Sequence, residues 1–179
     1  MSFTNGLLAS ARLVSMEIRE VRPEEYEEAG DVVAGAYSEF WDPNDPSWGE
    51  HIELVRDVAG RVDRTVVLVA VEDGRVLGSA SIEMDDVIGD DDREAIPGVA
   101  GLRMVGVDPT RRRHGIGRAL IEEVIARCGA AGKHTLILRT TPPMVPAQRL
   151  YQALGFERAA DLDIPIDEHL TLLGYRLRL

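Results

Sequence analysis

The segment that most constrains the fold is residues 101–131, where a strand, a short turn and a helix are expected in succession. Residues 101–107 read GLRMVGV, a strand-like run that ends at Asp108-Pro109. The next residues, RRRHGIGRAL, lead into a helix expected over 115–131, whose apolar stripe is Ile116, Leu120, Ile121, Val124, Ile125 and Cys128. A helix with such a stripe must bury it, so a helix-covered sheet is expected.

Expected strands and helices also alternate along the rest of the chain. Strands are expected over 16–22, 65–84, 135–141 and 170–179, and helices over 24–39, 51–58 and 146–154. Asp73-Gly74 splits the stretch 65–84 into a hairpin, because this dipeptide suits a type I′ turn. The prediction is an α/β fold of the α+β type, with a central mixed sheet of about six to seven strands flanked by about four helices.

One domain is expected over residues 16–179. Residues 1–15 lack the basic region of a signal peptide, and they are interpreted as a disordered leader or an over-called start. No apolar run approaches the roughly 20 residues that a membrane-spanning helix needs. Cys128 is the only cysteine, which fits a cytoplasmic protein, and no Cys/His cluster has the spacing of a zinc site, so no metal is predicted.

The net charge of -11 counts against broad binding to nucleic acid or to an anionic membrane. It is compatible with a cationic partner such as an amine, and equally with a surface that serves only solubility. Against this background, the cluster RRRHGIGR at 111–118 stands out as locally basic.

A helix start beside glycines is suited to hold an anion. The first amides of a helix have no internal partner and lie at the positive end of its dipole. Gly115 and Gly117 would let a ligand approach the backbone, while Arg112, Arg113 and Arg118 would add charge. The motif does not match a P-loop or a dinucleotide fingerprint. A surface arginine cluster without a ligand remains the alternative.

Two motifs together carry a family resemblance. Arg112-Arg113-His114-Gly115-Ile116-Gly117 follows a strand and opens a helix, and Ala147-Gln148-Arg149-Leu150-Tyr151-Gln152-Ala153-Leu154-Gly155-Phe156 follows the next strand. In this the sequence resembles the GNAT superfamily of acetyl-CoA-dependent N-acetyltransferases over residues 16–179, most specifically over 101–156. The resemblance implies a single GNAT-like domain with strands that splay apart at the coenzyme A site.

The resemblance also assigns the co-substrate and its contacts. The ligand would be acetyl-CoA, with its pyrophosphate on the backbone amides of Arg112, Arg113, His114, Gly115, Ile116, Gly117 and Arg118. The pantetheine arm would pair with backbone groups of Met104, Val105 and Val107, as an added strand. Relatives often place an asparagine where this chain has Met144, so one contact to that arm is absent here.

Acyl transfer to an amine needs a neutral amine, a donor for the oxyanion and a proton for the leaving thiolate. Tyr151 matches the general-acid tyrosine of the family, although it could also be a core aromatic. The backbone N–H of Val105 is the candidate oxyanion donor. The strand sequence AGLRMVGV contains no carboxylate, so the base is Glu83, His51 or a water; solvent exposure of Glu83 and His51 is the competing interpretation.

Three further residues have two interpretations each. Cys128 lies on the helix stripe and is predicted to be a small buried hydrophobe rather than an acyl carrier. Trp41 and Trp48, in or beside the loop 40–49, either line the acceptor pocket or anchor the loop.

The sequence therefore predicts an N-acetyltransferase that moves an acetyl group to a primary amine by direct attack through a tetrahedral intermediate. The acceptor would be a small molecule or a peptide amine, selected by loops around 38–60 and 85–98. A non-catalytic acyl-CoA-binding or sensing domain is the alternative, and nucleic-acid binding through the arginines is disfavoured by the overall charge. A homodimer is left open.

Overall fold

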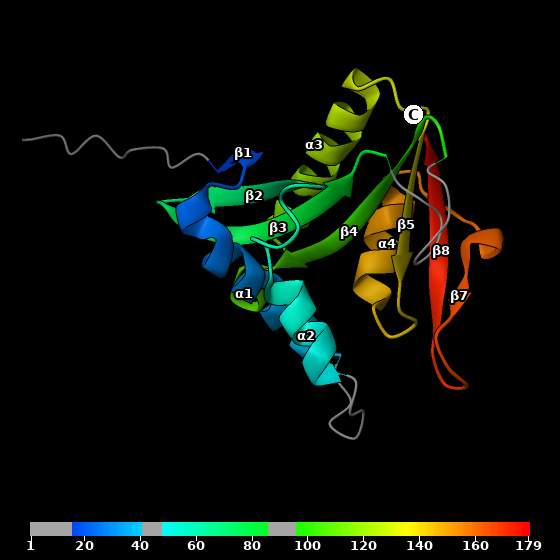
Figure 1. The fold of residues 1–179 in the computed structure, drawn as a ribbon, viewed down its shortest axis with the longest axis horizontal. Coiled ribbons are helices and arrows are strands. Elements are labelled where there is room, and N and C mark those ends of the chain that lie inside the picture. The colour runs from blue at the N-terminus through cyan, green and yellow to red at the C-terminus, as the bar shows by residue number, and fades with distance from the viewer. Residues whose placement is uncertain (1–15, 41–47, 86–95) are drawn as a thin grey trace, which may run out of the picture.

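The computed structural model describes residues 16–40, 48–85 and 96–179 (Figure 1). Four helices and eight strands make up this part of the chain: β1 (Glu17–Glu20), α1 (Tyr26–Ser38), α2 (Trp48–Arg56), β2 (Val66–Glu72), β3 (Arg75–Glu83), β4 (Val99–Val107), α3 (Ile116–Ala130), β5 (Thr135–Thr140), α4 (Val145–Ala153), β6 (Glu157–Arg158), β7 (Ile164–Pro165) and β8 (Thr171–Arg178). The expected leader at 1–15, Trp41 and most of the acidic loop 85–98 lie outside the described residues.

All eight strands belong to one sheet, in the order β1-β2-β3-β4-β5-β8-β6, with β7 paired to β8. Strands β4 and β5 run parallel, and the other pairs are antiparallel. The predicted mixed α/β fold is confirmed. Strands β6 and β7 were not predicted, because two residues each are too few to show a period in the sequence.

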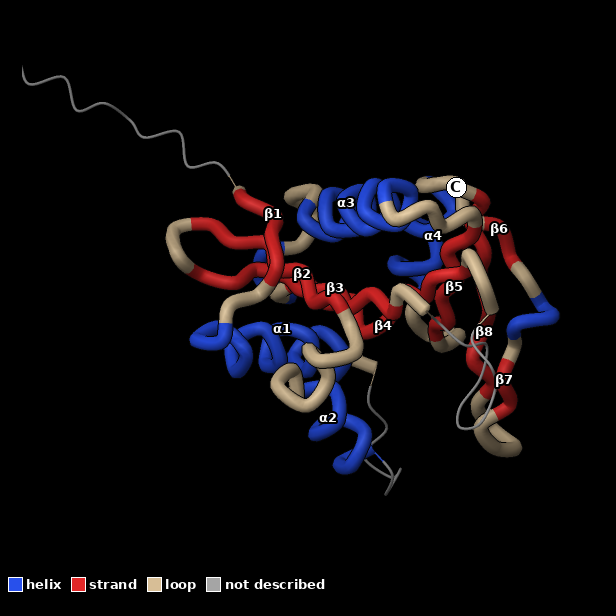
Figure 2. Tube along the Cα trace, turned by 45° about the horizontal axis from the view of Figure 1, so that its top comes forward, coloured by secondary structure: helices blue, strands red, loops and turns tan. Residues whose placement is uncertain are grey.

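Helices cover both faces of the sheet. Helices α1 and α2 lie on one face, and α3 and α4 on the other (Figure 2). The predicted stripe of α3 is buried on the sheet, with Leu120, Ile121, Val124 and Cys128 fully inaccessible to solvent. The predicted turn at Asp73 and Gly74 is also confirmed, since both residues have positive φ angles of 52° and 75°.

Strands β4 and β5 separate halfway along their length. Their pairing runs from Val99↔Thr135 to Leu102↔Leu138 and then stops, although β4 continues to Val107. Just beyond that point β4 contains a bulge, where Met104 and Val105 together lie opposite a single residue of β3. A bulge bends its strand and increases the local twist. The splayed strands implied by the sequence resemblance are therefore present.

The bulge places one residue in an unusual conformation. Met104 has a φ of 49°, in the left-handed region that residues other than glycine seldom adopt. Such strain persists only where the surrounding structure holds it in place. Here Met104 packs against Val33, Ala34 and Val55, which anchor it to α1 and α2.

Helix α1 lies directly on β4. A Cβ atom on Gly106 would fall 2.6 Å from the Cα of Val33, so no side chain fits between the helix and the strand. This close approach fixes the position of the C-terminal half of α1 against the bulged part of β4. It therefore brings α1 side chains to the separated ends of the strands.

We expect Gly106→Ala to destabilise the protein by about 1–3 kcal/mol, because the added methyl group must push α1 away from β4. The free energy of unfolding in urea measures this change. Gly129→Ala is the matched control, since no atom lies within 4 Å of a Cβ at that exposed position on α3. The control should leave the stability unchanged or raise it by up to about 1 kcal/mol; equal losses in both variants would contradict the packing argument.

Candidate active site

The gap between β4 and β5 exposes backbone groups of β4. The N–H of Asp108 bonds to Leu77 O in β3 at 2.9 Å, and Gly106 pairs with Ser79 of β3. Because successive residues of a strand direct their polar groups to opposite edges, those of Val105 and Val107 point toward the gap. These are two of the three residues whose backbone was expected to pair with pantetheine; the third, Met104, occupies the bulge.

The start of α3 presents a run of unpaired amides beside this gap. The first backbone bond of the helix runs from Ala119 N–H to Gly115 O, at 2.9 Å. The N–H groups of Ile116, Gly117 and Arg118 therefore have no carbonyl partner within the helix. Arg113 and Gly115 both have positive φ, 64° and 78°, which turns the chain sharply into the helix. Successive amides in such a turn form a concave anion site.

Three of the four arginine side chains of this segment are engaged in ion pairs. Arg111 pairs with Glu72, Arg112 with Glu39, and Arg118 with Glu122. The His114 ring nitrogen Nδ1 lies 2.8 Å from the carbonyl oxygen of Arg112. Exposed pairs of this kind contribute little energy and exchange readily. The fixed part of the anion site is therefore the backbone, and the arginines can turn to an incoming phosphate.

Tyr151 lies on α4 and is 7% exposed. Its ring packs edge-on against Phe156, with 5.8 Å between ring centroids, and its centroid lies 6.2 Å from that of Tyr175. Burial, and then the nearby Tyr37 hydroxyl, raise the pKa of Tyr151 well above its ordinary value. The ring is thus a core aromatic, and its hydroxyl keeps its proton at neutral pH, as a proton donor must.

Tyr37 lies near the end of α1, partly buried, and the sequence analysis gave it no role in the site. Burial raises the pKa of its hydroxyl to about 12, against smaller lowering effects of the Arg61 charge and of a hydrogen bond from the backbone of Val105. The ring of Tyr37 packs in one cluster with Met104 of β4.

Arg61 is a second residue that the sequence analysis did not single out. It is 5% exposed, and its Nη1 donates to the carbonyl oxygens of Val55 at 2.9 Å and Asp57 at 2.8 Å. Its Nε donates to the hydroxyl of Ser81 in β3 at 3.2 Å. Burial lowers its pKa, and charge interactions with Asp57 and Tyr37 oppose this. A buried cation thus lies on the α1 face of the sheet.

The candidate bases lie on that same face. Glu83 ends β3 and forms an ion pair with Arg103 of β4, at 2.8 Å. His51 stacks on Tyr37, with ring centroids 6.4 Å apart, and lies 5.6 Å from the ring of Trp48. Trp48 begins α2 instead of lying in the preceding loop. These contacts do not show whether Glu83 or His51 accepts the amine proton, so both assignments stay predictions.

Met144 and Cys128, both considered in the sequence analysis, can now be placed. Met144 caps the start of α4, where its sulfur lies 3.5 Å from the Thr140 hydroxyl. Cys128 is fully buried, as predicted, and burial raises the pKa of its thiol to about 11, so it is not a nucleophile at neutral pH. Among the described residues, no group of three His, Cys, Asp or Glu side chains could hold a metal ion.

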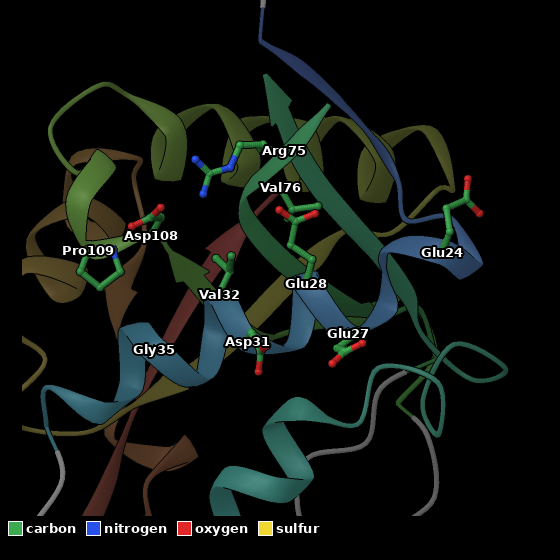
Figure 3. A pocket seen from close by; sticks show the side chains of 10 residues that line it. All are labelled: Glu24, Glu27, Glu28, Asp31, Val32, Gly35, Arg75, Val76, Asp108 and Pro109. Carbon is green, nitrogen blue, oxygen red and sulfur yellow. The ribbon is translucent and has the colours of Figure 1, made fainter. Parts of the chain in front are cut away.

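A separate pocket of about 430 Å³ lies between α1 and the segments around Arg75 and Asp108 (Figure 3). Its titratable lining consists of five carboxylates and one guanidinium: Glu24, Glu27, Glu28, Asp31, Asp108 and Arg75. This excess of negative charge repels phosphate. Of these two places, the start of α3 is therefore the better suited to a polyphosphate.

Comparison with known proteins agrees with this geometry. Residues 33–156 match the family model described as Acetyltransferase (GNAT) family. The chain belongs to the GNAT family. The matched region includes the end of α1, the splayed strands, the turn before α3 and Tyr151, so the motif-based resemblance is confirmed.

Two curated relatives are similar to parts of this GNAT chain. Mycothiol acetyltransferase from Cellulomonas flavigena is 35% identical over 95 residues, which cover 52% of this chain and 27% of the relative. The [ribosomal protein bS18]-alanine N-acetyltransferase of Escherichia coli is 40% identical over 60 residues, covering 34% of this chain and 40% of that enzyme. The chain thus spans less than half the length of these relatives.

Solved structures share the whole fold. A GNAT-family acetyltransferase from Desulfovibrio desulfuricans has a TM-score of 0.72 at 22% identity, covering 92% of this chain and 99% of that one. A GNAT acetyltransferase from Brucella melitensis, solved with acetyl-CoA, has a TM-score of 0.61 at 28% identity, covering 92% and 91%. Within the described ranges, the present chain contains no helix whose length and apolar content would let it cross a membrane.

We expect Gly117→Glu to weaken binding of coenzyme A at least tenfold, because it places a carboxylate among the amides that would face the pyrophosphate. The fold should persist, since a Cβ there meets Leu150 and Val107 only at ordinary contact distances of 3.4 and 3.5 Å. Isothermal titration with coenzyme A and a thermal melt measure both effects. Gly129→Glu adds the same charge near the far end of α3; equal affinity in the two variants would exclude the anion site.

Proposed function

We propose that this protein transfers an acetyl group from acetyl-CoA to a primary amine. The proposal rests above all on one observation: the unpaired amides at the start of α3 lie beside the gap where β4 leaves β5. A polyphosphate and an extended amide-containing arm both find partners there. A GNAT structure solved with acetyl-CoA has the same overall fold, which supports this choice of co-substrate.

The residues present fit the coenzyme. Gly115 has no atom within 4 Å of a Cβ position, so the backbone of the turn is open to a ligand. The amides from Arg112 to Arg118 would hold the pyrophosphate, and the backbone of Val105 and Val107 would pair with the pantetheine amides. Acetyl-CoA supplies the activated acetyl group as its thioester.

The chemistry then needs only groups that the chain contains. The neutral amine attacks the thioester carbon, and the Val105 N–H donates to the oxygen that becomes negative. When the C–S bond breaks, Tyr151 gives its proton to the departing thiolate. The amine proton leaves to Glu83, His51 or water, and each of these remains a candidate.

The proposed class of amine acceptor follows from the charge of the chain and from the name of one relative. The negative net charge favours approach of a cationic amine. One relative is named for N-acetylation of an alanine of ribosomal protein bS18, so a peptide α-amine is the first acceptor to test. Small-molecule amines and lysine side chains are the further candidates. A cytoplasmic location stays a proposal from the single cysteine, and binding to nucleic acid or membranes is not expected.

A non-catalytic acyl-CoA sensor is the second candidate. It is favoured by the lack of a carboxylate in β4 and by the ion pair that holds Glu83 to Arg103. A sensor would bind acetyl-CoA through the same amides without releasing a thiol. Neither candidate depends on the oligomeric state, so a homodimer remains a separate prediction.

A thiol-release assay separates the two candidates. Purified protein is mixed with acetyl-CoA and a panel of alanine-starting peptides, lysine peptides and small primary amines, and free thiol is detected colorimetrically. We expect release above the rate of hydrolysis with at least one class of amine. Tight binding of acetyl-CoA without release across the whole panel would favour the sensor.

We expect Tyr151→Phe to lower kcat about 10²-fold or more while changing the affinity for acetyl-CoA little, because only the proton for the leaving thiolate is lost. Steady-state kinetics and titration measure the two quantities. Tyr26→Phe makes the same change at the start of α1 and should leave both unchanged. Full turnover by the Tyr151 variant would remove this residue as the acid.

A further inference from the structure

Helix α2 is packed tightly at its C-terminal end and carries aromatic rings at its N-terminal end. Val55, near the C-terminal end, is fully inaccessible to solvent. A Cβ atom on Gly30 of α1 would fall 2.2 Å from the carbonyl oxygen of Arg56, so the two backbones are in close contact there. At the other end Trp48 is half-buried and His51 is exposed, with 5.6 Å between their ring centroids. The C-terminal end is therefore the fixed end of α2.

The ring-bearing end of α2 lies beside the bulge of β4. Ile52 packs in one cluster with Tyr37 of α1 and with Met104 of the bulge. The His51 ring stacks on Tyr37, with an interplanar angle of 18°. The residue after Met104 is Val105, whose N–H is the proposed oxyanion donor. An amine that approaches a thioester at Val105 from this face of the sheet would therefore meet α2.

Arg61 joins the fixed end of α2 to the sheet. Its Nη1 donates to the carbonyl oxygens of Val55 at 2.9 Å and Asp57 at 2.8 Å, and more weakly to that of Leu54 at 3.4 Å. The last carbonyls of a helix have no partner within it, and a cation there is favoured by the helix dipole. The Nε of the same guanidinium donates to the hydroxyl of Ser81 in β3, at 3.2 Å. One planar group thus bridges α2 and β3.

The bridge depends on an arginine. Arg61 is 5% exposed and Ser81 is 1% exposed, so the contact is shielded from solvent. A guanidinium serves several acceptors at once through a rigid fork of donors, whereas a lysine ammonium is a point charge. Within the described part of the chain, the Nη2 of Arg61 is buried without a hydrogen-bond partner. Since apolar side chains of similar volume are often at least as stabilising as a buried charge, stability alone does not account for Arg61.

Two attachments set the direction of α2. Gly30 of α1 and Ser81 of β3, through Arg61, hold its C-terminal end from two sides. Trp48 lies about 10 Å from Val55 along the helix, so a tilt of about 10° at the fixed end moves Trp48 by roughly 2 Å. Displacements of about 1 Å in a group that positions a substrate already lower reaction rates. Loss of one attachment therefore shifts the rings relative to β4.

We propose that Arg61 is a positioning residue, which fixes α2 on β3 so that the end with Trp48 and His51 contacts the amine acceptor. This inference rests on the proposed acetyl transfer. Arg61 and Ser81 are too deeply buried to touch the acceptor, so they act through the helix. Neither residue belongs to the anion site at the start of α3, so binding of coenzyme A should not depend on them.

Arg61→Lys tests the role of the bridge, because it keeps the positive charge and loses the fork of donors. With the best acceptor of the amine panel, we expect the KM for the amine to rise about tenfold, while the KM for acetyl-CoA stays within about twofold of the wild type. Steady-state kinetics measure both. Arg56→Lys is the matched control, since Arg56 ends α2 with an exposed side chain paired with Asp31 and Glu53. The control should keep both KM values; an unchanged amine KM in Arg61→Lys would contradict the proposal.

Ser81→Ala removes the other side of the bridge. If Arg61 acts through Ser81, this variant should also raise the KM for the amine, and the double variant should raise it no further than Arg61→Lys alone. Rises that multiply in the double variant would show that the two residues act independently, and would overturn the bridge. A thermal melt checks that each variant is folded. If Arg61→Lys does not fold, the amine KM of Ser81→Ala decides.

The fluorescence of Trp48 tests contact with the acceptor without turnover. Trp41→Phe leaves Trp48 as the only tryptophan, and this variant is titrated with the amine in the presence of coenzyme A. We expect the amine to change the emission of Trp48, with half-saturation at an about tenfold higher concentration when Arg61→Lys is added. An amine that is acetylated but leaves the emission unchanged would overturn the contact. A wild type that acetylates no amine would instead overturn the proposed function, and this inference with it.

Discussion

The separation of β4 from β5 beyond Leu102 is the constraint on which the rest of the site depends. A paired strand satisfies its own backbone groups and has nothing to offer a ligand. The bulge at Met104 and Val105 bends β4 away, and it leaves polar groups facing a gap. The proposed binding of the pantetheine arm therefore depends on this separation of the strands.

An acidic protein can still offer a local site to a polyphosphate. The chain carries a net charge of -11, and three of the four arginines in residues 111–118 are paired with glutamates. Any attraction for phosphate is therefore local, and it would come from amides whose positions are set by the helix and by positive φ at Arg113 and Gly115. The acidic pocket of Figure 3 would repel phosphate, so charge favours the start of α3 for the proposed coenzyme.

The residues that the sequence could identify are those whose role follows from neighbours along the chain. The turn at Asp73-Gly74 and the stripe of α3 depend on local conformation and on a regular period, and both were predicted. Tyr37 and Arg61 could not be found in this way. Tyr37 packs in one cluster with Met104 of β4, and Arg61 donates to Ser81 of β3; these neighbours lie far away in the sequence and meet only after folding.

By itself, the sequence determined the order of the longer helices and strands, the glycine turn that can hold an anion, and the family motifs around Gly117 and Tyr151. These are local properties, since backbone preference and periodicity act over a few residues. Only the tertiary structure decided where β4 leaves β5, which face each aromatic residue takes, and that α1 packs on the bulged part of β4. Those outcomes depend on strand pairing and on the packing of α1 against Gly106, contacts between residues far apart along the chain.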